Sequence, residues 1–227
     1  MKKSHNKFET IIHGIFLILG LITVGFVLLI TVYLVIAGIP AIREIGLFKF
    51  LFGKKWASTA STPSYGILPF ILTSIYGTAG AIIIGVPIGF LTAVYLAKVA
   101  NKKMKAVVEM AVSLLAGIPS VVYGFFGLTV FVPLLRQLTG HDGSTMLTAS
   151  VLLGIMILPT VTGVAEPALK SVPTSYYEGA LALGATHEKS VFGTVFPAAK
   201  SGVLAGVVLG IGRAIGETMA VIMVAGN

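Results

Sequence analysis

The uncharged stretch from Ile11 to Ala37 constrains this chain more than any other feature of its sequence. It contains no Lys, Arg, Asp or Glu, and it exceeds the roughly 20 apolar residues with which a helix crosses a lipid bilayer. Three lysines precede it, as in a signal peptide, but the run is longer than the apolar region of such a peptide and no cleavage motif follows. We therefore predict an uncleaved first span at residues 11–37, with residues 1–10 in the cytoplasm.

The composition of the whole chain excludes most other classes of protein. The 227 residues are 56% hydrophobic and 11% charged, and the mean hydropathy is +0.99, which is far too apolar for a soluble domain. The formal charge of +8 is spread over short clusters between apolar runs, which favours membrane orientation and contact with lipid over nucleic-acid binding. The chain has no cysteine, and its histidines and carboxylates show no metal-ligand or catalytic spacing. We expect no enzyme activity, no metal and no cofactor.

Four further apolar runs predict an all-α, polytopic transmembrane helical bundle of about five spans. The third run, residues 107–135, is interrupted by glycines and Pro119, so its middle is either kinked or broken, and we favour a kink. The positive-inside rule places the polar stretch 166–202 in the cytoplasm and the loop 38–66, with Trp56 and other aromatic residues, outside. The later spans are predicted at residues 67–97, 107–135, 146–165 and 203–225.

The polar stretch 166–202 contains local signals for a short helix. Pro173 stops the preceding helix, Ser175 and Glu178 have the spacing of a capping box, and Gly184 follows a run of good helix formers. These signals predict a short amphipathic helix on the cytoplasmic side, where it takes no part in spanning the bilayer. It is either an ordinary capped loop helix or a surface that docks on a soluble partner.

The residues of this predicted helix resemble the EAA signature of ABC importer permeases. In that signature E-A-A is followed by three residues, a glycine, nine residues and I-x-L-P. This chain has Glu178-Gly179-Ala180, Gly184 and Thr194-Val195-Phe196-Pro197 at the same spacing, with substitutions at the first alanine, the isoleucine and the leucine. The resemblance implies the MetI-like permease fold and a coupling helix that sits in a cleft of a cytoplasmic ATPase. It assigns Glu178, Gly179, Ala180, Gly184 and Pro197 to the ATPase contact.

Three further segments resemble the C-type permease subunit of the phosphate-specific (Pst) importer: Tyr65–Pro69, Ala116–Gly124 and Gly210–Val221. The resemblance implies translocation of inorganic phosphate across the plasma membrane of a prokaryote. It also implies a second homologous permease subunit, a cytoplasmic ATPase dimer and an extracytoplasmic phosphate-binding protein as partners. Because the chain contains no G-x-x-x-x-G-K-[ST] motif, ATP would be bound by the partner subunit. Permeases of this group usually have a sixth helix, so we expect the natural protein to continue beyond Asn227.

Charged residues within the last apolar run are the candidates for the solute pathway. Arg213 lies in the predicted span 203–225, where an arginine costs roughly 2.5–3.5 kcal/mol on insertion scales and needs a partner. Glu217 follows four residues later, on the same face of a continuous helix, and we expect the two to pair. They are either a structural ion pair or a phosphate site, in which Glu217 competes with the anion for the guanidinium donors. The resemblance to the Pst permease supports the second interpretation, because both residues match positions considered important for phosphate passage.

Three rival functions remain open. A permease of the same architecture could carry another oxyanion, such as sulfate or molybdate. An ion-coupled secondary transporter would usually show two similar halves, which this sequence lacks. A structural membrane scaffold would show no dependence on a solute.

Overall fold

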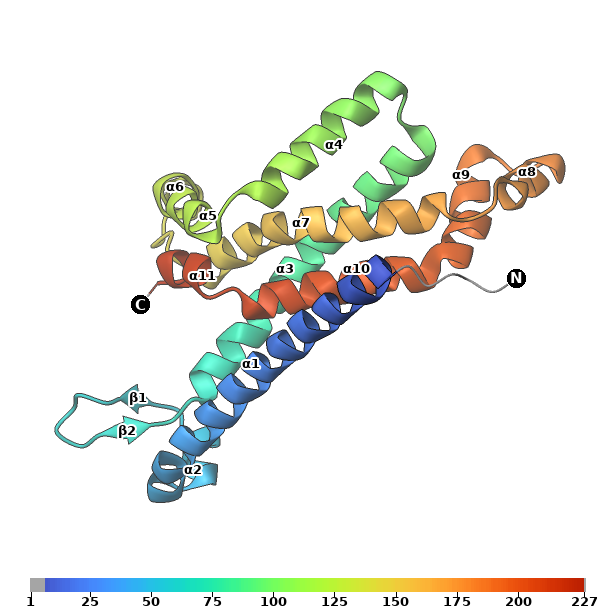
Figure 1. The fold of residues 1–227 in the computed structure, drawn as a ribbon. Coiled ribbons are helices and arrows are strands. Elements are labelled where there is room, and N and C mark those ends of the chain that lie inside the picture. Colours follow the sequence, from blue (N-terminus) through green and yellow to red (C-terminus); the bar gives the residue numbers. More distant parts are fainter. Residues whose placement is uncertain (1–6, 227) are drawn as a thin grey trace. The chain divides into compact units, whose positions relative to one another are not determined.

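The structure, a computed structural model of the protein, describes residues 7–226 and is mostly helical (Figure 1). Within that range five helices are long and apolar enough to cross a membrane, which confirms the predicted all-α bundle of five spans. Residues 1–6 of the predicted cytoplasmic segment 1–10 lie outside the described residues, and so does Asn227. The chain divides into two compact units, residues 1–70 and 71–227. The candidate spans are Glu9–Ile45, Leu68–Val99, Ser120–Thr139, Met146–Lys170 and His187–Gly216.

The first unit is built on one long helix, α1 (Lys7–Ile45). It runs past the predicted end at Ala37 and through Pro40, and it stops where Gly46 takes a φ of 86°. Glycine reaches this left-handed region without a steric penalty, which is why it commonly ends helices. The external loop predicted at 38–66 is therefore helical in its first part.

The rest of the first unit is a small hairpin that the sequence did not predict. The ring of Trp56 lies 5.7 Å from that of Tyr65, across the hairpin, and 5.5 Å from that of Phe70. The backbones of Gly53 and Gly66 approach so closely that a Cβ on either would overlap the other, so only glycine fits at both positions. The elements are α2 (Leu47–Phe52), β1 (Trp56–Ala57) and β2 (Ser64–Tyr65), and the two strands pair antiparallel.

The second unit is organised around α7 (Met146–Lys170), the candidate span with the largest buried share. In Figure 1 α10 (Phe196–Gly216) runs alongside α7. Cβ atoms on Gly206 and Gly210 of α10 would press on Val164 and Val161 of α7, so these glycines let the two backbones come close.

Helix α3 (Leu68–Val94) also packs on α7 through glycines that let the two backbones come close. A π-helical turn, η1 (Tyr95–Val99), extends α3. A Cβ on Gly85 would lie 2.5 Å from the carbonyl oxygen of Gly154 and 2.6 Å from Cγ1 of Ile157. The hydroxyl of Thr162 donates to the carbonyl of Gly89 at 3.1 Å, a buried bond that also joins the two helices. The second predicted span, residues 67–97, agrees with the observed Leu68–Val99.

The third predicted span, residues 107–135, is broken and not kinked, and its predicted bounds are wrong. The chain forms α4 (Lys102–Gly117), turns at Ile118 and Pro119 in extended conformation, and starts again as a separate helix. Proline lacks a backbone N–H and disfavours helical geometry in the residue before it, so this point is a break and not a kink. The membrane-spanning candidate is the part after the break, which consists of α5 (Ser120–Phe126), η2 (Gly127–Phe131) and α6 (Val132–Thr139).

The fifth predicted span, residues 203–225, is wrong at both ends. The helical segment starts earlier, with α9 (His187–Ser190), η3 (Val191–Val195) and α10, because Lys200 lies exposed on the helix surface and does not end it. It also stops earlier, at Gly216, and a separate helix α11 (Met219–Val224) follows. The predicted polar loop 166–202 is shorter as a result, since α7 also continues through Lys170.

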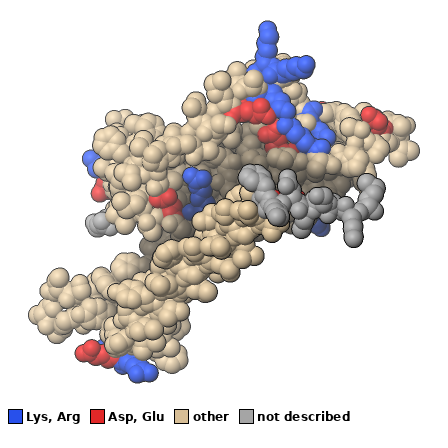
Figure 2. Space-filling model, in the orientation of Figure 1, with Lys and Arg blue, Asp and Glu red and all other residues tan. Residues whose placement is uncertain are grey.

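The surface in Figure 2 is mostly neither acidic nor basic, and large apolar side chains are exposed along the candidate spans. In water such a surface would aggregate, whereas in a bilayer it faces lipid tails.

We expect Gly85→Val to destabilise the second unit by about 1–3 kcal/mol, the usual cost of overpacking a closely packed contact. The added side chain would press on the backbone of Gly154 and the side chain of Ile157. The free energy of unfolding in mixed detergent micelles measures the effect. Gly163→Val on α7 is the matched control, because a Cβ there meets nothing within 4 Å. Equal losses in both variants would mean that helix propensity, and not packing, sets the cost.

Candidate coupling and pathway sites

The segment between α7 and α9 contains the predicted short helix, α8 (Thr174–Ala182). Its start differs from the prediction, because Ser175 lies inside the helix and no side chain caps its N-terminus. The carbonyl of Pro173 accepts the backbone N–H of Tyr176 at 3.1 Å instead. The predicted capping box of Ser175 and Glu178 is therefore wrong, and proline geometry sets the start of the helix.

The end of α8 is the predicted one. Gly184 has a φ of 84°, and the N–H of Ala185 donates to the carbonyl of Ala180 at 3.1 Å, which closes the last turn. This is the pattern of a glycine-terminated helix, in which a residue with a Cβ would be strained. The position of Gly184 thus has a local structural reason, separate from any partner.

One residue of α8 fastens it to the following segment. The hydroxyl of Tyr177 lies 2.7 Å from Nδ1 of His187, and the two rings meet edge to face with centroids 5.6 Å apart. Tyr177 also packs against the buried cluster that contains Leu169 and Val191. The helix is therefore fixed on one side only.

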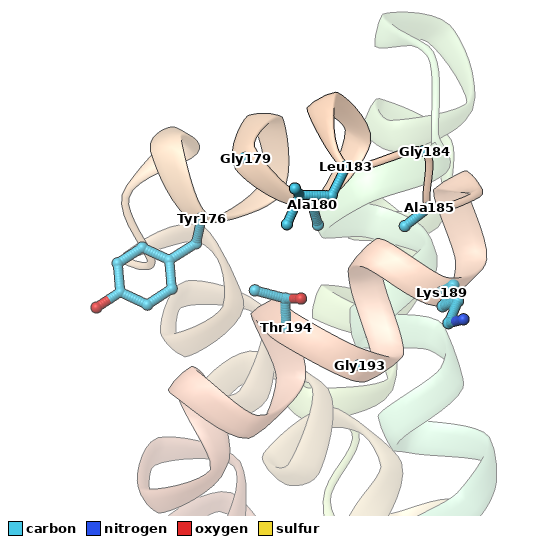
Figure 3. Close-up of a pocket in the computed structure, with 9 residues that line it drawn as sticks. All are labelled: Tyr176, Gly179, Ala180, Leu183, Gly184, Ala185, Lys189, Gly193 and Thr194. Atoms are coloured by element: carbon cyan, nitrogen blue, oxygen red, sulfur yellow. The ribbon is translucent and has the colours of Figure 1, made fainter.

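The other surface of α8 is exposed and takes part in no ion pair of the described chain. Glu178 is exposed and makes no ion pair among residues 7–226, and Leu183 is 91% exposed. An open hollow of about 550 Å³ lies between α8 and the segment that follows it, with Ala180 and Leu183 facing Thr194 (Figure 3). Its lining residues are Tyr176, Gly179, Ala180, Leu183, Gly184, Ala185, Lys189, Gly193 and Thr194.

The hollow brings together three of the five residues predicted for coupling, namely Gly179, Ala180 and Gly184. Glu178 lies on the exposed surface of the same helix. Pro197 stands apart from them, exposed in α10 directly after the π-helical turn η3.

The predicted ion pair between Arg213 and Glu217 is wrong. Arg213 is in the last turn of α10, whereas Glu217 has an extended backbone (φ −79°, ψ 118°) just after the helix ends at Gly216. The expectation of a shared face required a continuous helix through both residues. No ion pair joins them in the structure of residues 7–226, and Oε1 of Glu217 accepts the N–H of Ala220 at 3.1 Å, which caps α11.

Arg213 has a different partner, on α7. Its Nη1 lies 3.4 Å from the hydroxyl of Thr160, and the guanidinium is partly exposed. The neighbouring Ala214 belongs to a buried cluster that also contains Tyr123 of α5 and Ala220 of α11. The guanidinium keeps donors free for an anion, since a single long hydrogen bond uses one of its five N–H groups.

Sequence reasoning missed a set of charges on α4 and α7, which we call the charge ring: Lys105, Glu109, Glu166 and Lys170. Ion pairs join these side chains both within and between the two helices. The sequence carried part of the signal, because opposite charges stand four residues apart on each helix. It carried no signal that the two helices place these pairs against each other.

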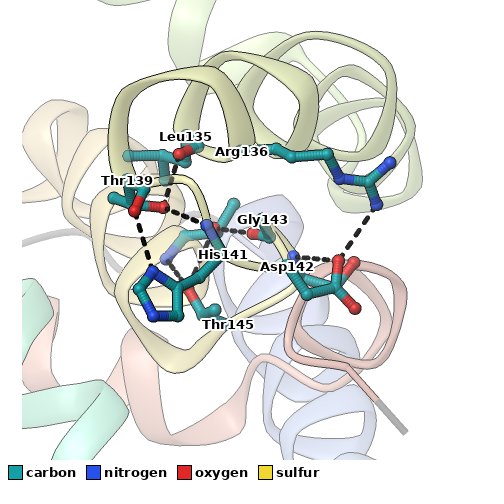
Figure 4. A network of polar contacts seen from close by, with 9 residues as sticks. Leu135, Arg136, Thr139, His141, Asp142, Gly143 and Thr145 are labelled. Atoms are coloured by element: carbon teal, nitrogen blue, oxygen red, sulfur yellow. Dashed lines mark hydrogen bonds and ion pairs between the residues drawn. The ribbon is translucent and has the colours of Figure 1, made fainter.

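The turn between α6 and α7 is held by its own polar network (Figure 4). Nη2 of Arg136 donates to Oδ1 of Asp142 at 3.0 Å, and this bond lowers the pKa of the Asp142 carboxyl below its usual value. Nδ1 of His141 lies 2.8 Å from the carbonyl of Thr139, and Thr145 caps α7. These contacts give the turn a structural role, and none of its residues was predicted as a site.

Comparison with known proteins gives matches over most of the chain. A family model described as "Binding-protein-dependent transport system inner membrane component" matches residues 85–227. The "Probable ABC transporter permease protein YqgH" of Bacillus subtilis is 39% identical over 211 residues, which are 92% of this chain and 68% of the relative. The "Phosphate transport system permease protein PstC" of Mesorhizobium japonicum is 34% identical over 200 residues, which are 79% of this chain and 61% of the relative. The chain thus spans 68% and 61% of the length of these two curated relatives.

A solved structure supports the same fold. A chain of "Inward facing conformations of the MetNI methionine ABC transporter: CY5 SeMet soak crystal form" aligns with a TM-score of 0.52 at 24% identity, over 66% of this chain and 68% of that chain. The helical arrangement is therefore that of a MetI-type permease.

We expect Gly184→Ala to destabilise the α8–α9 turn by about 1–2 kcal/mol, because alanine is strained at a φ of 84°. Limited proteolysis of the purified protein measures the effect as faster cleavage between residues 180 and 190. Gly179→Ala is the matched control, since it has no positive φ and a Cβ there meets nothing within 4 Å. Equal cleavage of the two variants would contradict the strained turn.

Proposed function

The chain belongs to the family of binding-protein-dependent transport system inner membrane components, and on this premise we propose that it translocates inorganic phosphate in an ATP-driven importer. It is an ABC transporter permease, a multi-pass protein of the plasma membrane whose family carries out no catalysis of its own. The proposal adds the solute, the residues and the partners. The observation that carries it is the exposed surface of α8, which has no use within the described chain and lies inside the matched region.

In the proposed complex α8 is the coupling helix. Glu178, Gly179 and Ala180 contact a dimer of cytoplasmic ATPase subunits, and the hollow beside α8 gives a partner side chain room to enter. Gly184 supports the contact by ending the helix sharply, and Pro197 belongs to the same segment. This places residues 1–10 and the 166–202 segment on the cytoplasmic side and the 38–66 segment outside.

The proposed solute is phosphate, because Arg213 offers a donor set that suits a tetrahedral oxyanion. Arg213 lies in the last turn of α10, beside the break before α11, and irregular backbone in a membrane protein lines a cavity or packs against protein. The similarity to a phosphate transport permease supports the choice of anion. Glu217 shapes this place by capping α11, and not by pairing with Arg213.

The remaining partners follow from the same proposal. A second homologous permease subunit completes the pathway, and an extracytoplasmic phosphate-binding protein delivers the anion. The alternative solutes are sulfate and molybdate, which present the same oxyanion chemistry to Arg213; competition for uptake separates the three.

We expect Glu178→Lys to lower phosphate uptake at least about tenfold in cells that express the complete transporter at matched membrane abundance. The reversed charge would oppose docking of α8 on the ATPase, and like-charge contacts at an interface cost several kcal/mol. Depletion of cellular ATP should abolish wild-type uptake as well. Glu188→Lys on α9 is the matched control, an exposed acid outside α8. Unchanged uptake in Glu178→Lys and after ATP depletion would point to an ion-coupled secondary transporter.

We expect Arg213→Ala to lower phosphate uptake at least about tenfold, since a hydrogen bond to a charged group contributes about 1.5–3 kcal/mol. Arg213→Lys should fall between this variant and the wild type, because lysine keeps the charge and loses the planar fork. Glu217→Gln should cost less than Arg213→Ala, because its amide oxygen can still cap α11. The measurement is uptake of radiolabelled phosphate. Normal uptake in Arg213→Ala at normal abundance would exclude this residue from the pathway.

A further inference from the structure

The four side chains of the charge ring form a closed circuit of ion pairs. Lys105 Nζ lies 3.7 Å from Glu109 Oε1 and 4.0 Å from Glu166 Oε1. Lys170 Nζ lies 3.8 Å from Glu109 Oε1 and also contacts Glu166. Each acid therefore has both lysines as partners, one on its own helix and one on the other. Figure 2 shows acidic and basic side chains gathered side by side over α4 and α7.

The position of Glu166 makes these pairs necessary. Glu166 is only 8% exposed, and its neighbours Ala165 and Leu169 in the same buried cluster are fully buried. A carboxylate in such surroundings is costly unless a cation stays beside it. Because two lysines surround it, Glu166 stays neutralised even when one of them moves away.

Helix α4 has little else to hold it at this end. None of its residues is buried, and Leu115, which packs against the buried cluster around Ala214, lies at the other end of the helix. Ion pairs between long side chains keep their attraction over a range of positions, whereas packed side chains do not. The charge ring therefore connects α4 to α7 in a way that permits displacement.

The charge ring also lies on a continuous path between the two proposed sites. Glu166 is in the last turns of α7, and only residues 171–173 separate α7 from α8. At its other end α4 is joined to α5, where the hydroxyl of Tyr123 donates to the carbonyl of Leu115 at 2.8 Å. Tyr123 belongs to the buried cluster that contains Ala214, the neighbour of Arg213.

We propose that Lys105, Glu109, Glu166 and Lys170 are positioning residues that keep α4 attached to α7 while α7 slides past it, so that movement of α8 changes the break beside Arg213. When α8 moves α7, the helices shift past each other and the lysines exchange carboxylate partners, so no charge is left unpaired. A movement of this kind is a small shear between packed helices. The inference rests on the proposed coupling role of α8.

The movement itself can be measured without reference to the solute. The chain contains no cysteine, so spin labels can be placed at Val107→Cys on α4 and Gly163→Cys on α7 alone. Val107 is 60% exposed, and a Cβ on Gly163 meets nothing within 4 Å. The control pair is Gly163→Cys with Leu204→Cys, which joins α7 to the closely packed α10.

In the assembled transporter, with nucleotide absent and with ATP trapped on the ATPase, we expect the α4–α7 label distance to change by at least about 2 Å. The α7–α10 distance should change less. An unchanged α4–α7 distance, or an equal change in both pairs, overturns the proposal. A changed α4–α7 distance in a transporter that does not carry phosphate would support the proposed role of the charge ring and refute the proposed solute.

Charge variants test whether the exchange of partners matters for transport. Glu166→Gln should raise the ATP hydrolysed per phosphate transported at least about threefold at matched membrane abundance, because it removes the more buried of the two acids that both lysines share. Reversal of all four charges restores every pair and should return this ratio toward the wild-type value. Glu44→Gln, at an exposed site in the first unit, is the control. If the charge ring only held the two helices together, Glu166→Gln would lower the amount of folded protein and leave the ratio of ATP hydrolysed to phosphate transported unchanged. That result refutes the proposal.

Discussion

Every part of this structure depends on the need to pair backbone N–H and C=O groups inside a hydrocarbon layer. No water is available there, so the chain must be helical wherever it faces lipid. Departures from the helix are tolerated only where protein covers them. Both observed breaks, at Ile118–Pro119 and at Glu217–Thr218, lie next to helices of one buried cluster, to which Tyr123, Leu152 and Ala220 belong. The side chain of Glu217 satisfies one of the backbone groups that its break leaves open.

Helix α7 connects the features that the proposed function uses. Glycines of α3 and α10 bring two other helices close to it, and Thr162 adds a buried hydrogen bond to α3. The same helix carries Thr160 beside Arg213, Glu166 in the charge ring, and the short link to α8. A displacement of α8 can therefore reach the neighbourhood of Arg213 through one rigid element. That arrangement suits a permease whose driving force is applied at one end of the molecule.

Helices α10 and α4 contact α7 in different ways, and this difference determines how each can move. Glycine contacts fix α10 to α7 at several points, where even one added methyl group would overlap the other helix. Helix α4 is joined by charges and has no buried residue. Two kinds of contact on one central helix thus divide the second unit into a part that moves with α7 and a part that can move against it.

The sequence predicted well what hydrophobicity controls. Length and apolarity of the runs gave five spans, and the helix around Glu178 with its end at Gly184 was evident from local residue types. These properties depend on the solvent and on a few neighbouring residues, so they can be read along the chain. The spacing of Glu178, Gly179 and Ala180 also predicted the family, which the match over residues 85–227 confirms.

The incorrect predictions concern the places where a helix ends inside an apolar run. The missed features are contacts between residues far apart in the sequence. The third span was predicted to be kinked although Pro119 breaks it, and Arg213 was paired with Glu217 although the helix ends between them. Hydrophobicity alone cannot show where a helix ends inside a membrane, because the choice depends on which backbone groups find partners in other helices. The charge ring shows the same limit. The sequence by itself determined that this chain forms membrane helices and that opposite charges stand four residues apart at 105 and 109 and at 166 and 170. Only the tertiary structure placed those charges against each other, because contacts between helices are set by packing and not by position along the chain.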